Sequence, residues 1–185
     1  MMTTDAKIVE INTRRQRAYY LLLGHKYSDS LREFLEVFDG KEVYISNCIA
    51  YIYSRKDFSG YDPEKAISYF TIGSELGDNF ATNAIGDVYA SMGQNANAMN
   101  YYSKAAEAGN AESFYSLYQI YMRRNELKSA FSNLERSAAL GHPPAITTLA
   151  ILSIEGRFGP SKILSGIISY FRNIPNLIRY SKKVI

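Results

Sequence analysis

The chain has 185 residues, of which 46% are hydrophobic and 21% charged, and its formal net charge is +3. These values are typical of an ordinary globular chain with a buried core, and they exclude a largely disordered protein. Its single cysteine, Cys48, excludes an intramolecular disulfide and cannot by itself build a zinc site.

The sequence also indicates the cellular compartment and whether a metal is bound. No stretch approaches the roughly 20 apolar residues that a membrane-spanning helix requires. The apolar run over residues 18–23 is too short for a signal peptide and lacks a small-residue cleavage site. His25 and His142 have no metal-ligand spacing around them. We therefore expect a cytoplasmic protein without a metal or another cofactor.

The N-terminal segment, residues 1–44, contains two short amphipathic patterns, over residues 14–25 and 29–38. They predict a pair of helices that caps a repeat array, because a terminal repeat lacks a neighbour on one face and departs from the common pattern. Glu33 and Glu36 lie three residues apart in the second pattern. Such a pair favours a solvated helix face over a catalytic pair of carboxylates.

The middle of the chain has an internal period of 32 residues. At four positions of the repeat, similar residues recur 32 residues apart in three successive copies. Such agreement indicates a repeat architecture rather than a non-repetitive helical bundle. The matched sets are Gly77, Gly109 and Gly141; Ala66, Ala98 and Ala130; Ile85, Leu117 and Leu149; and Ala81, Ser113 and Ala145.

Each unit of this period predicts two helices. In the most regular copy, apolar residues recur at spacings of three and four over residues 81–89 and again over residues 98–108. The two stripes are separated by a break at residues 93–95. Gly109 follows the second stripe, where a left-handed residue commonly ends a helix.

The segments 81–89 and 98–110 resemble a Sel1-like repeat, a relative of the tetratricopeptide repeats (TPRs). The resemblance rests on a small residue and a tyrosine in the first segment, and on paired aromatics, Ala-Ala and Gly in the second. It covers roughly residues 45–172. It implies an all-α fold, a right-handed α-solenoid of antiparallel helix pairs.

The neighbouring copies are less regular. The preceding copy has a longer loop between its helices, and Asp62-Pro63 predicts the start of its second helix. The following copy carries Tyr118 where the regular copy has Gly86, which predicts looser packing of its first helix. A fourth unit opens at Ala145, and residues 168–171 (Ile-Ser-Tyr-Phe) repeat the letters of residues 67–70.

The resemblance also implies where a partner binds. By similarity to TPR geometry, the first helix of each pair lines a concave groove. Its non-core residues are the candidate contacts: Tyr44, Asn47, Tyr51, Arg55, Asn83, Asp87, Tyr115, Gln119, Arg123 and Thr147. Tyrosines, amides and both signs of charge suit a protein or peptide partner better than a nucleic acid, which favours a uniformly basic track.

The C-terminal segment is basic and apolar. Residues 157–185 contain six Lys and Arg and no acid, whereas residues 1–156 contain 15 basic and 18 acidic residues, a net charge of −3. Two interpretations stay open. Residues 160–172 cap the solenoid, or they continue into residues 173–185 as a tail that contacts an anionic membrane or an acidic protein patch. The candidate tail contacts are Arg172, Arg179, Lys182 and Lys183.

No motif points to catalysis, since the chain has no phosphate-binding glycine loop, nucleophile elbow or paired-histidine zinc helix. The sequence therefore predicts a non-enzymatic scaffold or adaptor that binds a partner protein. Two alternatives remain: a peripheral membrane or envelope-assembly factor anchored by its C-terminus, and an inhibitor or immunity protein that blocks an enzyme. The identity of the partner and the oligomeric state stay open.

Overall fold

A computed structural model describes residues 4–157 and 163–184. In these residues all the regular secondary structure is α-helical. The helices are α1 (Thr4–Leu23), α2 (Tyr27–Val37), α3 (Val43–Ser54), α4 (Pro63–Glu75), α5 (Asn79–Ser91), α6 (Asn95–Glu107), α7 (Ala111–Arg123), α8 (Leu127–Ala139), α9 (Pro143–Ile154) and α10 (Ile163–Val184). The chain divides into two units, residues 1–98 (unit 1) and 99–185 (unit 2), with the boundary inside α6.

The turns between helices explain the glycine period. Gly109 has a φ of +89°, and its amide donates to the Ala106 carbonyl at 2.9 Å. Asn110 follows, and its side chain accepts from the Ser113 amide at 2.9 Å. One dipeptide thus ends α6 in the left-handed conformation and caps the start of α7, which confirms the predicted helix end at Gly109. The predicted start of α4 is also confirmed, because Asp62 caps it through the Lys65 amide.

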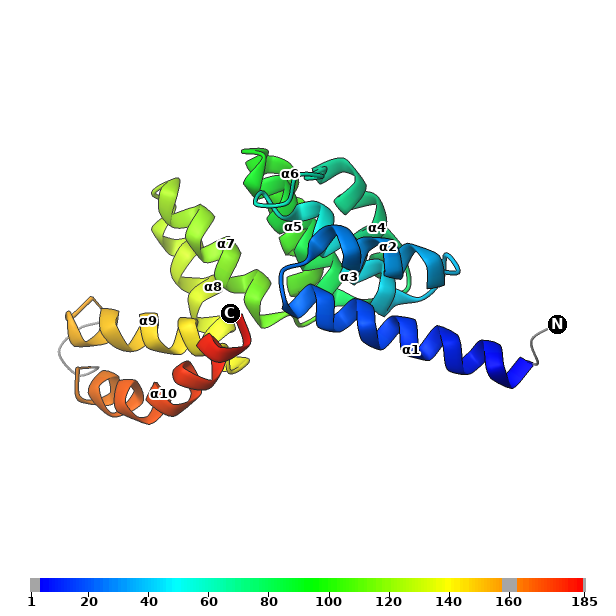
Figure 1. Ribbon diagram of the computed structural model, residues 1–185. Helices are drawn as coiled ribbons and strands as arrows, with labels where there is room; N and C mark the ends of the chain where they lie inside the picture. The colour runs from blue at the N-terminus through cyan, green and yellow to red at the C-terminus, as the bar shows by residue number, and fades with distance from the viewer. Residues whose placement is uncertain (1–3, 158–162, 185) are drawn as a thin grey trace. The chain divides into compact units, whose positions relative to one another are not determined.

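Unit 1 contains two antiparallel helix pairs, α1 with α2 and α3 with α4, followed by α5 (Figure 1). Its core lies where α1, α2 and α3 meet, and Phe34, Ile45 and Ile49 are at most 1% exposed there. Cys48 is buried in the same cluster, as predicted, and burial raises the pKa of its thiol to about 11. Gly73 lets α4 approach its neighbours closely, since a Cβ at this position would lie 2.9 Å from that of Ala81 in α5.

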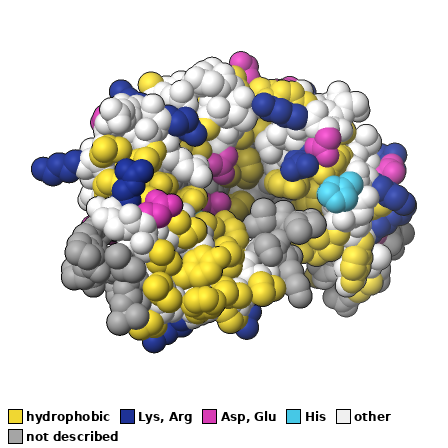
Figure 2. Space-filling view, turned by 90° about the vertical axis from the view of Figure 1, so that its left-hand side faces the viewer, with side chains coloured by type: hydrophobic (Ala, Val, Ile, Leu, Met, Phe, Trp, Pro, Cys, Tyr) yellow, Lys and Arg dark blue, Asp and Glu magenta, His cyan; other side chains and the backbone are white. Residues whose placement is uncertain are grey.

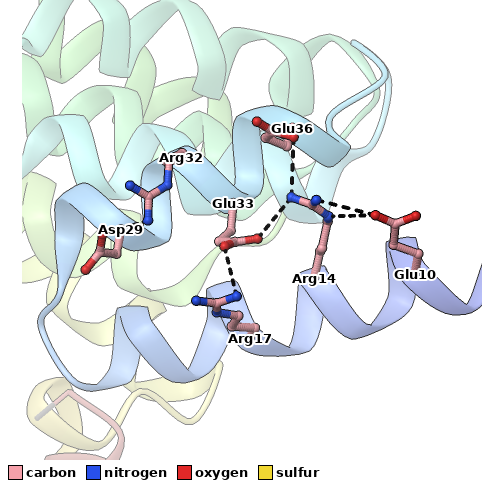
Figure 3. Close-up of polar contacts among 7 residues, drawn as sticks. All are labelled: Glu10, Arg14, Arg17, Asp29, Arg32, Glu33 and Glu36. Atoms are coloured by element: carbon pink, nitrogen blue, oxygen red, sulfur yellow. Dashed lines mark hydrogen bonds and ion pairs between the residues drawn. The ribbon is translucent and has the colours of Figure 1, made fainter.

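A network of ion pairs joins α1 to α2 (Figure 3). The guanidinium of Arg14 lies 3.5 Å from Glu33, 3.3 Å from Glu36 and 3.4 Å from Glu10. Arg17 contacts the second oxygen of Glu33 at 3.5 Å. The prediction of a solvated face is therefore wrong for Glu33, whose side chain is only 8% exposed. The pairing was missed because Arg14 and Arg17 lie 19 and 16 residues before Glu33 and meet it only when α1 packs against α2.

We expect Glu33→Gln to lower the free energy of unfolding by about 1–2 kcal/mol, because it leaves Arg14 and Arg17 without their buried counter-charge. The expected loss is below that of a fully buried pair because both arginines reach solvent. Urea denaturation measures it. Glu36→Gln is the matched control, since the Glu36 side chain is 56% exposed and also pairs with Arg14. Equal losses in the two variants would contradict the buried role of Glu33.

Unit 2 repeats the pairing with α7 and α8 and with α9 and α10, and one polar contact recurs in both pairs. Near the end of α8, the Ser137 hydroxyl donates to the Ala111 carbonyl at 2.7 Å. In α10, the Asn173 amide donates to the Pro143 carbonyl at 2.8 Å. Ser137 lies near the end of α8 and bonds the first residue of α7, so this pair is antiparallel. The α9–α10 pair is antiparallel as well, because Gly166 lies against Ala150 and the later Asn173 bonds the first residue of α9.

These contacts define the register of the fourth pair. Asn173 of α10 contacts Pro143 of α9, and Gly73 of α4 lies against Val43 of α3. Both residues of the first contact are numbered 100 higher than their counterparts in the second, so the two pairs align with a shift of 100 residues. Gly166 consequently occupies the position of the fully buried Ala66. The predicted match of residues 168–171 with residues 67–70 is wrong by one residue, since it implies a shift of 101. Phe171 accordingly is 65% exposed, whereas Phe70 is buried.

The helix α10 runs without interruption through residues 172 and 173, so the predicted start of a tail at residue 173 is not a break in the helix. It contains Pro175, which lacks an amide hydrogen and bends helices, and α10 curves along its length (Figure 1). Its contacts with α9 extend from Gly166 to Tyr180, whose ring lies 5.5 Å from that of His142.

Candidate functional site

The candidate contacts of unit 1 lie on α3 and α5, and two tyrosines of α3 are the most exposed aromatic residues among them. Tyr44 is 58% exposed and Tyr51 is 41% exposed. They are seven residues apart, two helical turns, and therefore lie on one face of α3. Burial and the neighbouring Cys48 raise the pKa of Tyr44 to about 12.

Arg55 extends this face beyond the end of α3. Its guanidinium carbon lies 5.6 Å from the centre of the Tyr51 ring, and its Nε donates to Asp57 at 3.0 Å. The hydrogen bond to Asp57 raises the pKa of Arg55 further and lowers that of Asp57. The cation is thus held over Tyr51, half-buried, with part of the guanidinium open to solvent.

The two candidate asparagines differ from the expectation. Asn47 is half-buried, and its amide donates to Asp78 at 2.6 Å while its Oδ1 is buried without a hydrogen-bond donor. Asn83 is 2% exposed and offers no surface to a partner, so the expectation that it faces the groove is wrong. Its amide donates to Asp87 at 3.3 Å. Asn83 therefore orients the exposed Asp87 carboxylate.

Two aromatic residues next to this surface were missed. Phe80, on α5, is 55% exposed and occupies the register of Tyr44 one repeat later. A comparison of this register across the repeats would have found it. Tyr19 comes from α1, and its ring centre lies 6.4 Å from that of Tyr44. No local sequence signal indicates Tyr19, because it belongs to the irregular N-terminal pair.

In unit 2, two of the candidate contacts interact with other residues of the unit, and two are exposed. The Tyr115 hydroxyl lies 3.2 Å from that of Thr148, and its ring lies 5.2 Å from that of His142. Thr147 accepts a hydrogen bond from Asn173 at 2.9 Å. Both residues thus take part in packing within unit 2. Gln119 and Arg123 of α7 are exposed and remain available to a partner.

The four tail candidates all lie on α10. Arg172 and Arg179 are exposed. The side chains of Lys182 and Lys183 lie outside the described residues.

The first-helix surface, as the term is used below, belongs to unit 1 and consists of the exposed Tyr44, Tyr51, Phe80 and Asp87 and the half-buried Arg55. The surface combines aromatic faces with both signs of charge, which match a polypeptide segment. Among the residues whose positions are described, no three His, Cys, Asp or Glu side chains gather as metal ligands would. Within the same part of the chain, no helix has the length and apolarity to cross a bilayer.

No protein-family model and no curated protein matches the sequence, but solved structures match the fold. A Sel1 repeat protein from Oxalobacter formigenes superposes with a TM-score of 0.67 at 16% identity, over 85% of this chain and 68% of that one. The protective antigen c5321 of uropathogenic Escherichia coli gives 0.67 at 20% identity, over 86% of this chain and 38% of that one. YrrB, a TPR protein with an unusual peptide-binding site, gives 0.56 at 17% identity over 98% of both chains.

The helix pairs, their glycine-ended turns and these superpositions define an α-helical repeat protein. More particularly, the fold is that of the Sel1-like and TPR-like repeats, as the sequence predicts.

Proposed function

We propose that this chain is a non-enzymatic interaction module that binds a segment of another protein on the first-helix surface. The observation that carries the proposal is the grouping of the exposed Tyr44 and Tyr51 with the half-buried Arg55 on and just after α3. Folding does not require two tyrosines to face solvent on a helix whose other face is fully buried. A binding surface does require them, because tyrosine provides a large apolar face and a polar tip.

The arrangement of Arg55 supports the same proposal. Tyrosine and arginine are enriched among the residues that dominate binding energy. Asp57 and Tyr51 already hold the guanidinium of Arg55 in place. A side chain that is ordered before binding loses less rotamer entropy when a partner docks.

The chemistry of the surface describes the partner we expect. Arg55 and the exposed Asp87 can pair with acidic and basic side chains, and the tyrosines can cover apolar ones. The peptide-binding site named for YrrB supports a peptide or protein segment as the ligand of this fold.

We expect Tyr44→Ala with Tyr51→Ala to weaken capture of the partner at least about 30-fold, because truncation of one hot-spot residue costs about 2 kcal/mol or more. Pull-down with quantitative mass spectrometry, comparing wild type and the double variant, identifies the proteins whose capture falls, and titration of the best candidate gives the dissociation constant.

Leu76→Ala is the matched control. Leu76 is 62% exposed and lies at the end of α4, a second helix of unit 1. Thermal melting of all variants verifies that they fold. If the double variant captures every protein as the wild type does, the first-helix surface of unit 1 is not the binding site.

A further inference from the structure

The helix α10 presents an apolar stripe that is partly open to solvent. Its members recur at spacings of three and four and therefore lie along one stripe. The stripe, called the α10 apolar face below, contains Ile167, Ile168, Phe171, Ile174 and Ile178, which are 36–65% exposed. Hydrophobic side chains gather in the lower part of the face shown in Figure 2, with Lys and Arg side chains at its lower edge.

The three sides of α10 have different roles. Gly166, Asn173 and Tyr180 form the side packed against α9. The α10 apolar face lies on another side. Arg172 and Arg179 are seven residues apart and border that face on the third side. The ion pairs found among the described residues include neither arginine.

We propose that the α10 apolar face binds an anionic membrane surface, with its isoleucines and Phe171 in the boundary between headgroups and acyl chains. This site is distinct from the first-helix surface. A helix with an aromatic and aliphatic face and cations at its edge matches helices that lie in the bilayer interface.

The charges favour a membrane over a second copy of the chain. Residues 157–185 contain six cations and no acid. A two-fold symmetric contact through α10 would bring the arginines of one copy near those of the other, and their repulsion would oppose it. An anionic bilayer instead attracts each cation near its surface.

The chain contains no tryptophan, so Phe171→Trp introduces a single fluorescent reporter at the centre of the proposed contact. We expect its emission to shift to the blue, and to be quenched by brominated lipids, when vesicles containing phosphatidylserine are added. Leu140→Trp is the matched control, since Leu140 is 52% exposed in unit 2 but lies at the end of α8. We expect no shift for this variant.

Vesicle co-sedimentation of the full chain tests the two parts of the contact. Phe171→Gln is expected to lower the partition coefficient about tenfold or more, since the ring no longer leaves water. Arg172→Gln with Arg179→Gln is expected to lower it about 30-fold on anionic vesicles, at about 1 kcal/mol per cation. Leu140→Gln is expected to bind as the wild type does, and melting curves verify folding.

Three results would overturn the proposal. One is the absence of both sedimentation and blue shift on anionic vesicles at low salt. The second is equal binding to zwitterionic and anionic vesicles, which would leave the arginines without a role. The third is self-association that Phe171→Gln abolishes in a chain that ignores vesicles, which would make the α10 apolar face an interface between copies.

Discussion

Lowering the pH from 7 to 4 is expected to reduce the free energy of unfolding by up to about 3 kcal/mol through His142 alone. Burial lowers the pKa of this side chain from its usual 6.5 to about 4, and each unit of difference corresponds to about 1.4 kcal/mol. His142 is 6% exposed and lies between the rings of Tyr115 and Tyr180. It also stands at the start of α9, where the helix dipole disfavours a cation.

The direction follows from the proton uptake of the two states. Between pH 6.5 and 4 the unfolded chain protonates His142, whereas the folded chain keeps it neutral. The unfolded state then binds more protons, so stability falls as the pH falls through this window. The contribution is fully present above about pH 6.5.

Urea denaturation of wild type and His142→Phe at several pH values between 7 and 4.5 isolates this contribution. The carboxylates titrate alike in both proteins, so the difference between the two free energies reports His142. We expect the wild type to lose stability relative to the variant as the pH falls. A difference that stays constant over this range would show that His142 is not the responsible group.

A second large effect is expected from Gly166→Leu, which should release α10 from α9. A Cβ at Gly166 would lie 2.8 Å from the Ala150 carbonyl oxygen and 2.8 Å from the Cβ of Ser153. Backbone atoms cannot yield as a side chain does, so the helices must separate. Overpacking of this kind costs about 1–3 kcal/mol.

Native-state hydrogen exchange, read by mass spectrometry on peptides of α9 and α10, measures this release. Protection in α10 is expected to fall by about tenfold to a hundredfold. Asn176→Leu is the matched control, because Asn176 is exposed on the same helix and a larger side chain there meets solvent. If Gly166→Leu keeps the protection of wild type, the close contact between α9 and α10 is wrong.

The repeat fold could be predicted from the sequence because its signals are local and repeated. Glycines such as Gly77 and Gly109 end helices in a left-handed conformation, and small residues such as Ala98 and Ala130 are fully buried between helices. Each signal needs only a few neighbouring residues, and the period confirms it in the next copy.

The fourth pair was misaligned because its signals are weak. Gly166 stands where the other copies have alanine. It follows Ala130 by 36 residues instead of the usual 32, because the loop between the two helices is longer. The identical sequence Ile-Ser-Tyr-Phe at residues 67–70 and 168–171 then favoured an alignment of the two helices that is wrong by one residue. Gly166 and Asn173 reveal their roles only through contacts with α9.

Part of the candidate site could be predicted for a similar reason. Helical spacing places Tyr44 and Tyr51 on one face, and both are exposed. Helical spacing does not show how deeply a side chain is buried, however, so the burial of Asn83 was missed. Nor does it reveal long-range partners: the bond from Asn173 to Thr147 joins residues 26 apart in the chain.

In the proposed complex, the exposed side chains of the first helices, rather than those of the second helices, contact the partner. Photo-crosslinking from benzoylphenylalanine identifies the contacting side chains, with the reporter at Tyr51 or Phe80 on first helices of unit 1 and at the exposed Lys104 or Lys128 on second helices. We expect the first two positions to yield an adduct with the same protein and the last two to yield none. Adducts of that protein from Lys104 or Lys128 at equal yield, with none from Tyr51, would contradict the claim.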